Sequence, residues 1–424
     1  MAYTFCPETD FVQLEKSISS LYGEQELQRE SSRYRRLLQG LKENFGPCER
    51  VAVFSAPGRT EIGGNHTDHQ HGRVLAGSVN LDVIAAVAPN GENVIRVKGD
   101  GFPLDVVELE DLEVHPEEYN SSRAIVRGVA AWFKSQGARL EGFDAYTTSS
   151  VFKGSGLSSS AAFEVLMGNI FNSLFLDGAC DPVRIAQMGK YVENVYFGKP
   201  SGLLDQMASS VGGMVTVDFA DNDQPVVEKL EFDFASAGHA LCIVDSGADH
   251  ADLTNEYAAV TTELKKICAH FGKSVLREVP EEDFVAALPE LRREAGDRAV
   301  LRAMHIYADN RRVAGQVEAL RRGDFDSFLK YVHDSGLSSW RYLQNVVPAG
   351  YTDRQEVAFA LALAERLLNT RGACRVHGGG FAGTIQAFVP LDMLDGFRAE
   401  VERVLGEGSC HVLTVRPLGG VRLA

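Results

Sequence analysis

The sequence lacks three features that each mark a separate class of protein: an excess of basic residues, long apolar runs and paired cysteines. Its 58 acidic residues outnumber its 42 basic ones, for a formal net charge of −16. Such a surface repels the phosphates of nucleic acids and of anionic membranes. No window approaches the roughly 18 uninterrupted apolar residues of a membrane span. We therefore expect neither a nucleic-acid partner nor a membrane partner.

Cysteine is scarce and scattered along the chain. The seven cysteines are odd in number and none belongs to a C-x-x-C pair, which argues against a disulfide framework and against a zinc knuckle. The first residues carry acids, Glu8 and Asp10, where a secretory signal needs a basic stretch followed by an apolar one. These absences predict a cytoplasmic protein.

Internal repeats and low-complexity tracts are also missing, which sets repeat architectures aside. With 45% apolar and 24% charged residues, the composition is ordinary for a globular enzyme. At roughly 150 residues per domain, 424 residues suggest two or three domains. The pattern predicts an α+β fold with a helical N-terminal extension over 1–40, a first domain over 41–225 and a second over 226–424.

Hydrophobic spacing predicts where the individual helices and strands lie. The expected helices cover residues 10–46, 122–136, 161–175, 252–271, 281–288, 310–322, 325–335, 355–368 and 391–405. The expected strands include residues 51–56, 79–88, 94–98, 143–152, 240–245, 384–389 and 410–416. The dipeptide Pro57-Gly58 is expected to end the first of these strands.

The strongest local signal is the segment Phe152-Lys-Gly-Ser-Gly-Leu-Ser-Ser-Ser-Ala-Ala, between an expected strand and an expected helix. Its glycines let the backbone approach a ligand, and its serines place hydroxyls and unpaired N–H groups at a helix N-terminus. Such a segment can cradle a phosphate; the alternative is a serine N-cap after an ordinary glycine turn. It matches neither a Walker loop nor a dinucleotide fingerprint.

A second segment, Ala56-Pro-Gly-Arg-Thr-Glu-Ile-Gly-Gly-Asn-His-Thr-Asp-His-Gln-His-Gly, concentrates polar side chains after a buried strand. Burying so many polar groups is unfavourable unless a polar ligand pairs with them. A polyol would do so. Two alternatives stay open: a metal site built from His66, Asp68, His69 and His71, or a solvated loop.

A third segment, Arg375-Val-His-Gly-Gly-Gly-Phe-Ala-Gly, precedes an expected strand. Four glycines in the six positions 378–383 offer little to a packed core. Close approach of this backbone to a ligand or to another loop is the favoured interpretation.

In this order, the three segments resemble the signatures of the GHMP small-molecule kinases and, more narrowly, of the galactokinases. That family has a Gly-Arg-x-Asn-x-Ile-Gly-Glu-His-x-Asp loop, a Pro-x-Gly-x-Gly-Leu-Ser-Ser-Ser-Ala loop and a late Gly-Gly-Gly-Phe-Gly-Gly turn. The resemblance extends from about Leu41 to Leu418. It implies a ribosomal-S5-like N-terminal domain, a ferredoxin-like C-terminal domain, and ATP-dependent phosphorylation of the anomeric hydroxyl of galactose in the cleft between them.

The resemblance also implies roles for particular residues. Gly202-Leu-Leu-Asp-Gln-Met is similar to the family's Gly-Ile-Met-Asp-Gln segment, which makes Asp205 the expected catalytic carboxylate, stabilised by Arg59. Ser160 and Glu193 are the expected Mg²⁺ ligands. The triphosphate of ATP is expected along Gly154, Ser155, Gly156, Leu157, Ser158, Ser159 and Ser160. Out of this context, Asp205 could simply cap a helix.

The implied sugar contacts lie mainly in the second segment. They are Glu61, Asn65, His66, Thr67, Asp68 and Tyr257. This loop departs from the galactokinase pattern: Glu61 stands in place of Asn, Gly63 of Ile, His69 of Tyr and Asn65 of Glu. An amide at position 65 would not repel a carboxylate at C6 of the sugar, so galacturonate, N-acetylgalactosamine and arabinose remain alternatives to galactose. Glu61 could also supply the missing carboxylate.

A second functional class is a regulator that binds sugar and ATP without turnover. Relatives of that kind have altered serines or lack the aspartate, whereas Ser159, Ser160 and Asp205 are all present here. The kinase interpretation is therefore preferred. The expected partners are a sugar and ATP, and the expected assembly is a monomer or a weak homodimer.

Overall fold

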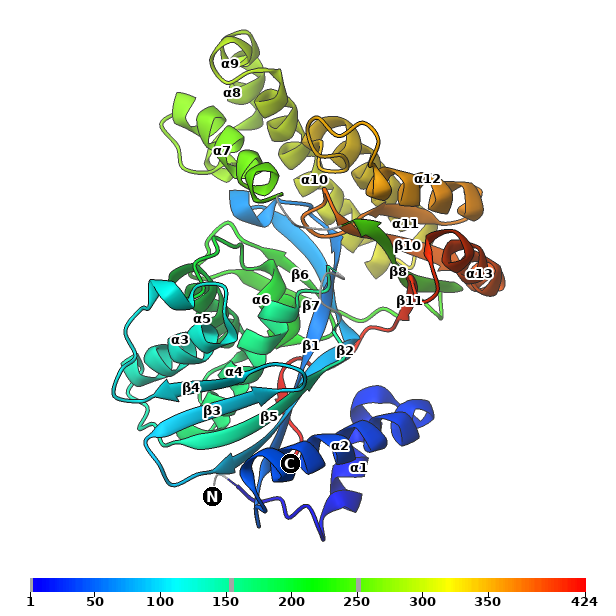
Figure 1. Cartoon of the computed structure of the whole chain (residues 1–424). Helices are drawn as coiled ribbons and strands as arrows, with labels where there is room; N and C mark the ends of the chain where they lie inside the picture. The colour runs from blue at the N-terminus through cyan, green and yellow to red at the C-terminus, as the bar shows by residue number, and fades with distance from the viewer. Residues whose placement is uncertain (1–2, 152–155, 249–252) are drawn as a thin grey trace.

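The computed structural model describes residues 3–151, 156–248 and 253–424, which form two β-sheets covered by helices (Figure 1). Within these residues the first sheet has eight strands, in the order β12-β1-β2-β5-β3-β4, with β6 pairing with β2 and β7 pairing with β6. The second sheet has four strands, in the order β11-β8-β10-β9. The predicted α+β class is confirmed.

The bounds of the elements follow the chain in two groups. The first sheet and its helices comprise α1 (Phe11–Tyr22), α2 (Leu27–Phe45), β1 (Ala52–Gly63), β2 (Arg73–Pro89), β3 (Val94–Gly99), β4 (Leu104–Glu108), α3 (Ser122–Ser135), β5 (Phe143–Ser149), α4 (Ser159–Phe175), α5 (Pro182–Val195), α6 (Leu204–Val211), β6 (Met214–Asp218), β7 (Val226–Leu230) and β12 (Val421–Arg422). The second group comprises β8 (His239–Ala248), α7 (Thr254–His270), α8 (Glu281–Ala286), α9 (Leu288–Glu294), α10 (Asp297–Arg321), α11 (Phe325–Ser338), α12 (Glu356–Leu368), β9 (Ala373–Val376), β10 (Gly383–Pro390), α13 (Leu394–Leu405) and β11 (Cys410–Leu413).

Strand β2 is buried on both faces, which explains its nearly continuous apolar sequence. Val83, Ala85 and Val87 point into the core shared with α3 to α5, while Ile84 and Ala86 point into the core shared with α1 and α2. Successive residues of a strand face opposite sides, so a two-sided strand needs apolar residues at every position. The N-terminal helices therefore form one layer of the fold (Figure 1).

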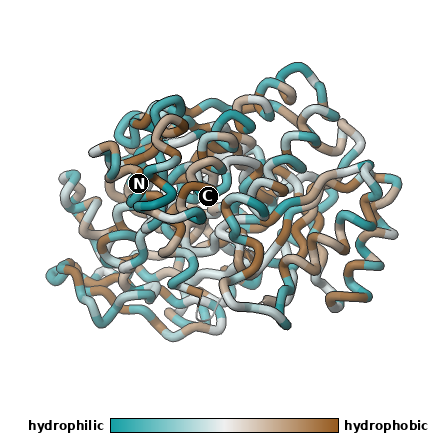
Figure 2. Tube along the Cα trace, turned by 90° about the horizontal axis from the view of Figure 1, so that it is seen from above, coloured by the Kyte–Doolittle hydropathy of each residue, from teal (hydrophilic) through white to brown (hydrophobic). Residues whose placement is uncertain are grey.

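The second sheet is covered on both faces as well. Cys242 and Ile385 pack with α12 and α13, whereas Leu241 and Phe388 face α11 across a cluster of phenylalanines. Viewed from above, hydrophobic and hydrophilic stretches alternate along the outer helices, as expected for amphipathic helices that bury one face (Figure 2).

The structure corrects two predictions about the elements and adds a strand that was not predicted. Strand β1 does not end at Pro57-Gly58 but continues to Gly63, and the proline is accommodated by a shift in the register with β2 between Pro57 and Arg59. Helix α10 begins at Asp297, well before the expected residue 310. The last residues also form the edge strand β12 beside β1. In the part of the chain that the structure describes, no helix is both long and apolar enough to span a membrane.

Candidate active site

The candidate site lies where β1 of the first sheet meets the N-terminal ends of α4 and α6. Arg59 sits in β1 directly after the register shift and donates from Nε to Oδ1 of Asp205, 2.6 Å away. Asp205 lies in the first turn of α6, and its other carboxylate oxygen accepts a hydrogen bond from the hydroxyl of Ser158. Two residues that are 146 positions apart thus form one ion pair.

The carboxylate of Asp205 is held in its ionised form. Burial by itself would raise its pKa, but the Arg59 guanidinium and the hydrogen bonds from Arg59 and Ser158 outweigh burial and hold the pKa below the ordinary value. The first turn of a helix favours negative charge as well. The side chain is still about one third exposed, at 31%, so a ligand can reach it.

The described part of the glycine and serine segment runs from Gly156 into α4. Residues 152–155, and with them the predicted contacts Gly154 and Ser155, lie outside the described residues. Gly156 has a φ of +68°, and a Cβ placed there would lie 2.6 Å from the hydroxyl of Thr384 in β10 and 3.0 Å from Nδ1 of His377 in the third segment. Only glycine fits this position. The first and third segments of the sequence therefore touch across the two sheets.

The start of α4 provides a site for an anion. Ser158 occupies the N-cap, and Ser159 and Ser160 follow in the first turn. The carbonyl oxygen of Leu157 accepts a hydrogen bond from the backbone N–H of Arg59 at 3.0 Å, which fixes this turn against β1. The N–H groups of a first helical turn have no intrahelical partner and favour a phosphate.

The predicted metal ligands, Ser160 and Glu193, are adjacent. The hydroxyl of Ser160 lies 3.4 Å from Oε1 of Glu193, and Lys199 donates to the same oxygen at 2.9 Å. Glu193 is almost fully buried, with a side chain 3% exposed. A hydroxyl and a carboxylate are the hard oxygen donors that Mg²⁺ prefers. Ser160 and Glu193 therefore fit Mg²⁺. The ammonium group of Lys199 lies beside this pair.

Behind this pair, Glu164 and Gln206 form a buried polar cluster that the sequence analysis missed. The amide nitrogen of Gln206 donates to Glu164 at 2.9 Å and to Glu193 at 2.8 Å. Among the residues that the structure describes, oxygen Oε1 of Glu164 has no hydrogen-bond partner. Burial and the neighbouring Glu193 raise the pKa of Glu164 well above its ordinary value. The one signal in the sequence was a single carboxylate within an otherwise apolar helix.

The sugar loop is tied to the second sheet through Asn65, whose side chain is fully buried. Its amide nitrogen donates to Glu61 at 3.0 Å and to the carbonyl of Gly378 at 2.7 Å. Its amide oxygen accepts from Ser339 at 3.1 Å and from Asn345 at 2.8 Å. All four hydrogen bonds of this amide are made within the protein. Asn65 therefore offers no polar atom to a sugar in this structure, contrary to the predicted contact.

Glu61 is also directed toward the second sheet. Its carboxylate forms an ion pair with Arg375 at 2.7 Å, and its backbone N–H donates to Nε2 of His377 at 3.2 Å. Burial raises the pKa of Glu61, although the charge of Arg375 opposes this shift. Thr67 is buried too, and its hydroxyl donates to the carbonyls of Gly64 and Arg73. Both side chains fix the conformation of the loop.

His66 and Tyr257 contact the glycine turn between β9 and β10. Nε2 of His66 lies 3.0 Å from the carbonyl of Gly379, so this nitrogen carries the proton, and burial lowers the pKa of His66 to about 4. The hydroxyl of Tyr257 donates to Gly380 at 2.8 Å. A Cβ at Gly202 would lie 1.7 Å from Asp68, which puts that carboxylate beside the segment leading to Asp205.

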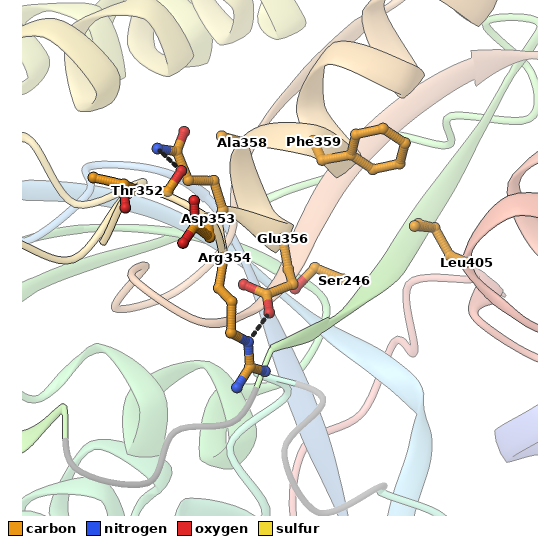
Figure 3. Close-up of a pocket in the computed structure, with 9 residues that line it drawn as sticks. Ser246, Thr352, Asp353, Arg354, Glu356, Ala358, Phe359 and Leu405 are labelled. Atoms are coloured by element: carbon orange, nitrogen blue, oxygen red, sulfur yellow. Dashed lines mark hydrogen bonds and ion pairs between the residues drawn. The ribbon is translucent and has the colours of Figure 1, made fainter. Parts of the chain in front are cut away.

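A separate open pocket of about 540 Å³ lies between β8 and α12. Figure 3 shows Arg354 and Glu356 pointing toward one another in it, with Phe359 and Leu405 on its apolar side. No residue predicted from the sequence to act in catalysis or binding lines this pocket. It is distinct from the site around Asp205.

Comparison with known proteins points to one family of kinases. Residues 41–89 match the model described as the galactokinase galactose-binding signature, and residues 124–213 match the N-terminal domain of GHMP kinases. The galactokinase of Streptomyces coelicolor is 30% identical over 364 residues, covering 85% of this chain and 90% of the relative. That of Glaesserella parasuis is 28% identical over 370 residues, covering 84% and 90%.

Solved structures agree at the level of the fold. A galactokinase of Lactococcus lactis complexed with galactose superposes with a TM-score of 0.78 at 24% identity, covering 92% of this chain and 99% of that one. A mevalonate kinase superposes with a TM-score of 0.59 at 13% identity, covering 86% and 99%. The two-sheet architecture is thus that of the GHMP kinases.

Proposed function

The chain belongs to the galactokinase family, and from this premise we propose that it transfers the γ-phosphoryl group of ATP to the anomeric hydroxyl of galactose, giving galactose 1-phosphate and ADP. The observation that carries this proposal is the ion pair of Arg59 and Asp205 beside the N-terminus of α4. It combines a reachable carboxylate with a helix end that attracts phosphate.

Asp205 would accept a hydrogen bond from the anomeric hydroxyl and hold it toward the γ-phosphate. Because its pKa is low, Asp205 acts mainly by orientation and charge, and takes the proton as the oxygen–phosphorus bond forms. This suits phosphoryl transfer, in which positioning and electrostatic stabilisation supply most of the rate. The Arg59 guanidinium would stabilise the negative charge of the phosphoryl group in transit.

The nucleotide would place its phosphates at the first turn of α4, against Ser158, Ser159 and Ser160. Ser160 and Glu193 would hold Mg²⁺, which neutralises part of the phosphate charge when bound. Lys199 donates to Oε1 of Glu193 and so holds that carboxylate in place beside Ser160.

For the sugar, we propose contacts from His66, Asp68 and Tyr257, with Glu61, Asn65 and Thr67 acting through the shape of the loop. With its proton on Nε2, His66 has Nδ1 as an acceptor for a hydroxyl. The amide of Asn65 is fully hydrogen-bonded within the protein. It therefore gives no reason to expect that the pocket accepts a sugar with a carboxylate at C6. Galactose is therefore the favoured substrate.

The test is the release of ADP by purified protein with ATP, Mg²⁺ and each of four sugars: galactose, galacturonate, N-acetylgalactosamine and arabinose. We expect turnover with galactose and a product that no longer reduces alkaline copper, because its anomeric oxygen is phosphorylated. Turnover with galacturonate at a comparable rate would instead support the relaxed pocket. Binding of galactose without ADP release would favour a regulator.

Loss of turnover on removing Mg²⁺ with EDTA would support the metal assignment.

We also propose a reducing compartment such as the cytoplasm as the place of this reaction. All seven cysteines are free thiols, and four of them are buried in cores. Proteins of oxidising compartments usually pair their cysteines.

A further inference from the structure

A buried carboxylate, Asp82, lies in the middle of β2 and is contacted by side chains from five other segments of the chain, those of Tyr22, Arg33, Ser55, Ser150 and Arg416. It is 0% exposed. Arg33 of α2 donates to Oδ1 at 2.5 Å, and Arg416 near the C-terminus donates to Oδ2 at 2.9 Å. Tyr22 of α1 and Ser55 of β1 donate to Oδ2 as well.

This cluster binds the N-terminal hairpin, residues 11–45, to the sheet by charge as well as by apolar packing. Arg33 also donates to the backbone carbonyl of Asp82 at 2.9 Å and to Glu30 at 3.2 Å. Two arginines and two carboxylates therefore balance one another in the interior. A buried polar network whose members are all bonded is stiff and fixes one arrangement of its parts.

Asp82 also lies next to two segments that border the proposed phosphate site. One is strand β1 just before Arg59, and the other is the stretch that precedes the phosphate segment. In β1 its partner across the strands is Pro57, at the register shift that presents Arg59. On the other side, the N–H of Ser150 donates to the carbonyl of Asp82 at 2.9 Å, and the N–H of Asp82 donates to the hydroxyl of Ser150 at 2.9 Å. Ser150 is the last residue but one before the undescribed part of the phosphate segment.

The two described ends of the phosphate segment converge on a single glycine of β1. A Cβ at Gly58 would lie 2.9 Å from the carbonyl oxygen of Leu157 and 3.3 Å from the side chain of Val151. Gly58 is the neighbour of Pro57, which pairs with Asp82. A displacement of Asp82 would thus move Ser150 and the Pro57–Arg59 turn together.

We propose that the N-terminal hairpin braces the phosphate segment through Arg33 and Asp82, which are positioning residues for nucleotide binding. This rests on the proposed kinase function. It assigns a role to the residues that precede the galactokinase-like part of the sequence. The hairpin sets the positions of Ser150, Gly58 and Arg59, which lie beside the start of α4, where the nucleotide phosphates are proposed to bind.

The test compares substitutions within the hairpin in the full-length protein. Calorimetric titration with ATP and Mg²⁺ gives the nucleotide Kd, and steady-state kinetics gives the KM for galactose. Arg33→Met should raise the Kd for ATP about fivefold or more while the KM for galactose stays within about twofold. Arg33→Lys, which keeps the charge, should recover part of the loss. Ser150→Ala removes the hydroxyl that bonds to the backbone of Asp82. This smaller change should also raise the Kd for ATP.

The matched control is Arg35→Met. Arg35 lies on the same helix, stacks on Phe11 and pairs with Glu15, and both of these partners belong to the hairpin. The inference is overturned if Arg33→Met leaves the ATP Kd unchanged, if it weakens both substrates equally, or if Arg35→Met has the same effect. Wild-type protein that binds ATP but phosphorylates no sugar would remove the kinase proposal, and the titration would still decide whether the brace exists.

Discussion

At the scale of single residues, the site depends on which side chains are charged at neutral pH. Asp205 is ionised because Arg59 and Ser158 overcome the effect of burial. His66 and His377 are neutral because burial lowers the pKa of each imidazole, to about 4 for His66 and well below its ordinary value for His377. These two histidines therefore add neutral imidazoles, not further cations, to the ion pair of Asp205 and Arg59.

Asp205→Asn should lower kcat by about 10²- to 10⁴-fold, because the amide keeps the shape of the side chain but cannot accept the proton of the anomeric hydroxyl. The KM values should change little, since the position of the sugar is set by other contacts. Steady-state rates of ADP release measure both quantities. A kcat within tenfold of the wild type would remove Asp205 from the proposed catalytic role.

Arg59→Met should change the pH dependence as well as the rate. In the wild type, Asp205 stays ionised below its ordinary pKa, so it imposes no loss of kcat/KM between pH 8 and pH 5. Without the guanidinium, burial remains and raises the pKa of Asp205, so kcat/KM should fall as the pH drops through that range. Arg73→Met, which loses an ion pair to Asp218 instead, is the control. Identical pH profiles for wild type and Arg59→Met would contradict the assigned cause.

At the scale of elements, helices and strands place these groups by burying everything around them. Helix α4 is apolar apart from its serines, a few amides and Glu164, and it packs against the first sheet while its N-terminus faces the site. The third glycine segment, between β9 and β10, accepts hydrogen bonds from Asn65, His66 and Tyr257 through its backbone carbonyls. Glycines leave those carbonyls open to side chains from the loop after β1 and from α7.

Glu164→Gln should stabilise the protein increasingly as the pH rises. The raised pKa means that the folded protein keeps a proton on Glu164 that the unfolded chain releases above about pH 4.5. Wild-type stability therefore falls with rising pH, by up to about 1.4 kcal/mol per pH unit, and the neutral amide removes this loss. Urea denaturation in EDTA at pH 5.5 and pH 8 measures the difference.

The exposed Glu110→Gln is the control for this experiment, since its side chain lies at the surface. A stability difference between Glu164→Gln and the wild type that is the same at both pH values would show that Glu164 is ionised in the folded protein. The ionised carboxylate of Glu164 would then need a positively charged partner within the cluster that it forms with Gln206 and Glu193.

At the scale of the whole molecule, the two sheets are joined beside the site by polar contacts. Gln386 of β10 donates to Thr60 at 2.6 Å and to the carbonyl of Glu61 at 3.0 Å, and Arg375 of β9 donates to the carbonyl of Ile62 at 2.9 Å. These bonds connect β1 to the second sheet over 313 to 326 positions of sequence. Groups from both sheets thus border one binding site.

Because groups from both sheets border the site, we expect bound ligands to raise the free energy of unfolding of the whole protein. Galactose at 100 times its Kd should add about 2.7 kcal/mol to the free energy of unfolding, and ADP with Mg²⁺ should add a further increment. Differential scanning calorimetry with each ligand and with both together measures this effect. Glucose, which differs from galactose in one hydroxyl, is the control sugar. Equal shifts with galactose and glucose would argue against a specific sugar site.

Single helices and strands follow from local patterns in the sequence. Periodicity predicted α3, α4 and β8 close to their observed positions, because helix and strand periods are local properties of a chain buried on one face or two. The three glycine segments carry the prediction of phosphate and sugar binding, which stays a prediction. Their order along the chain carried the resemblance to the galactokinases, which the relatives confirmed.

Which polar side chains bond within the protein follows from the packing of distant segments. Asn65 and Glu61 occupy the predicted sugar loop, yet they bond to Ser339 and Asn345, which follow α11, and to Arg375 of β9. Arg33 and Asp82 likewise meet only in the folded chain. Charge pairing and hydrogen bonding between distant segments depend on how the layers pack, and a linear pattern holds no record of that packing.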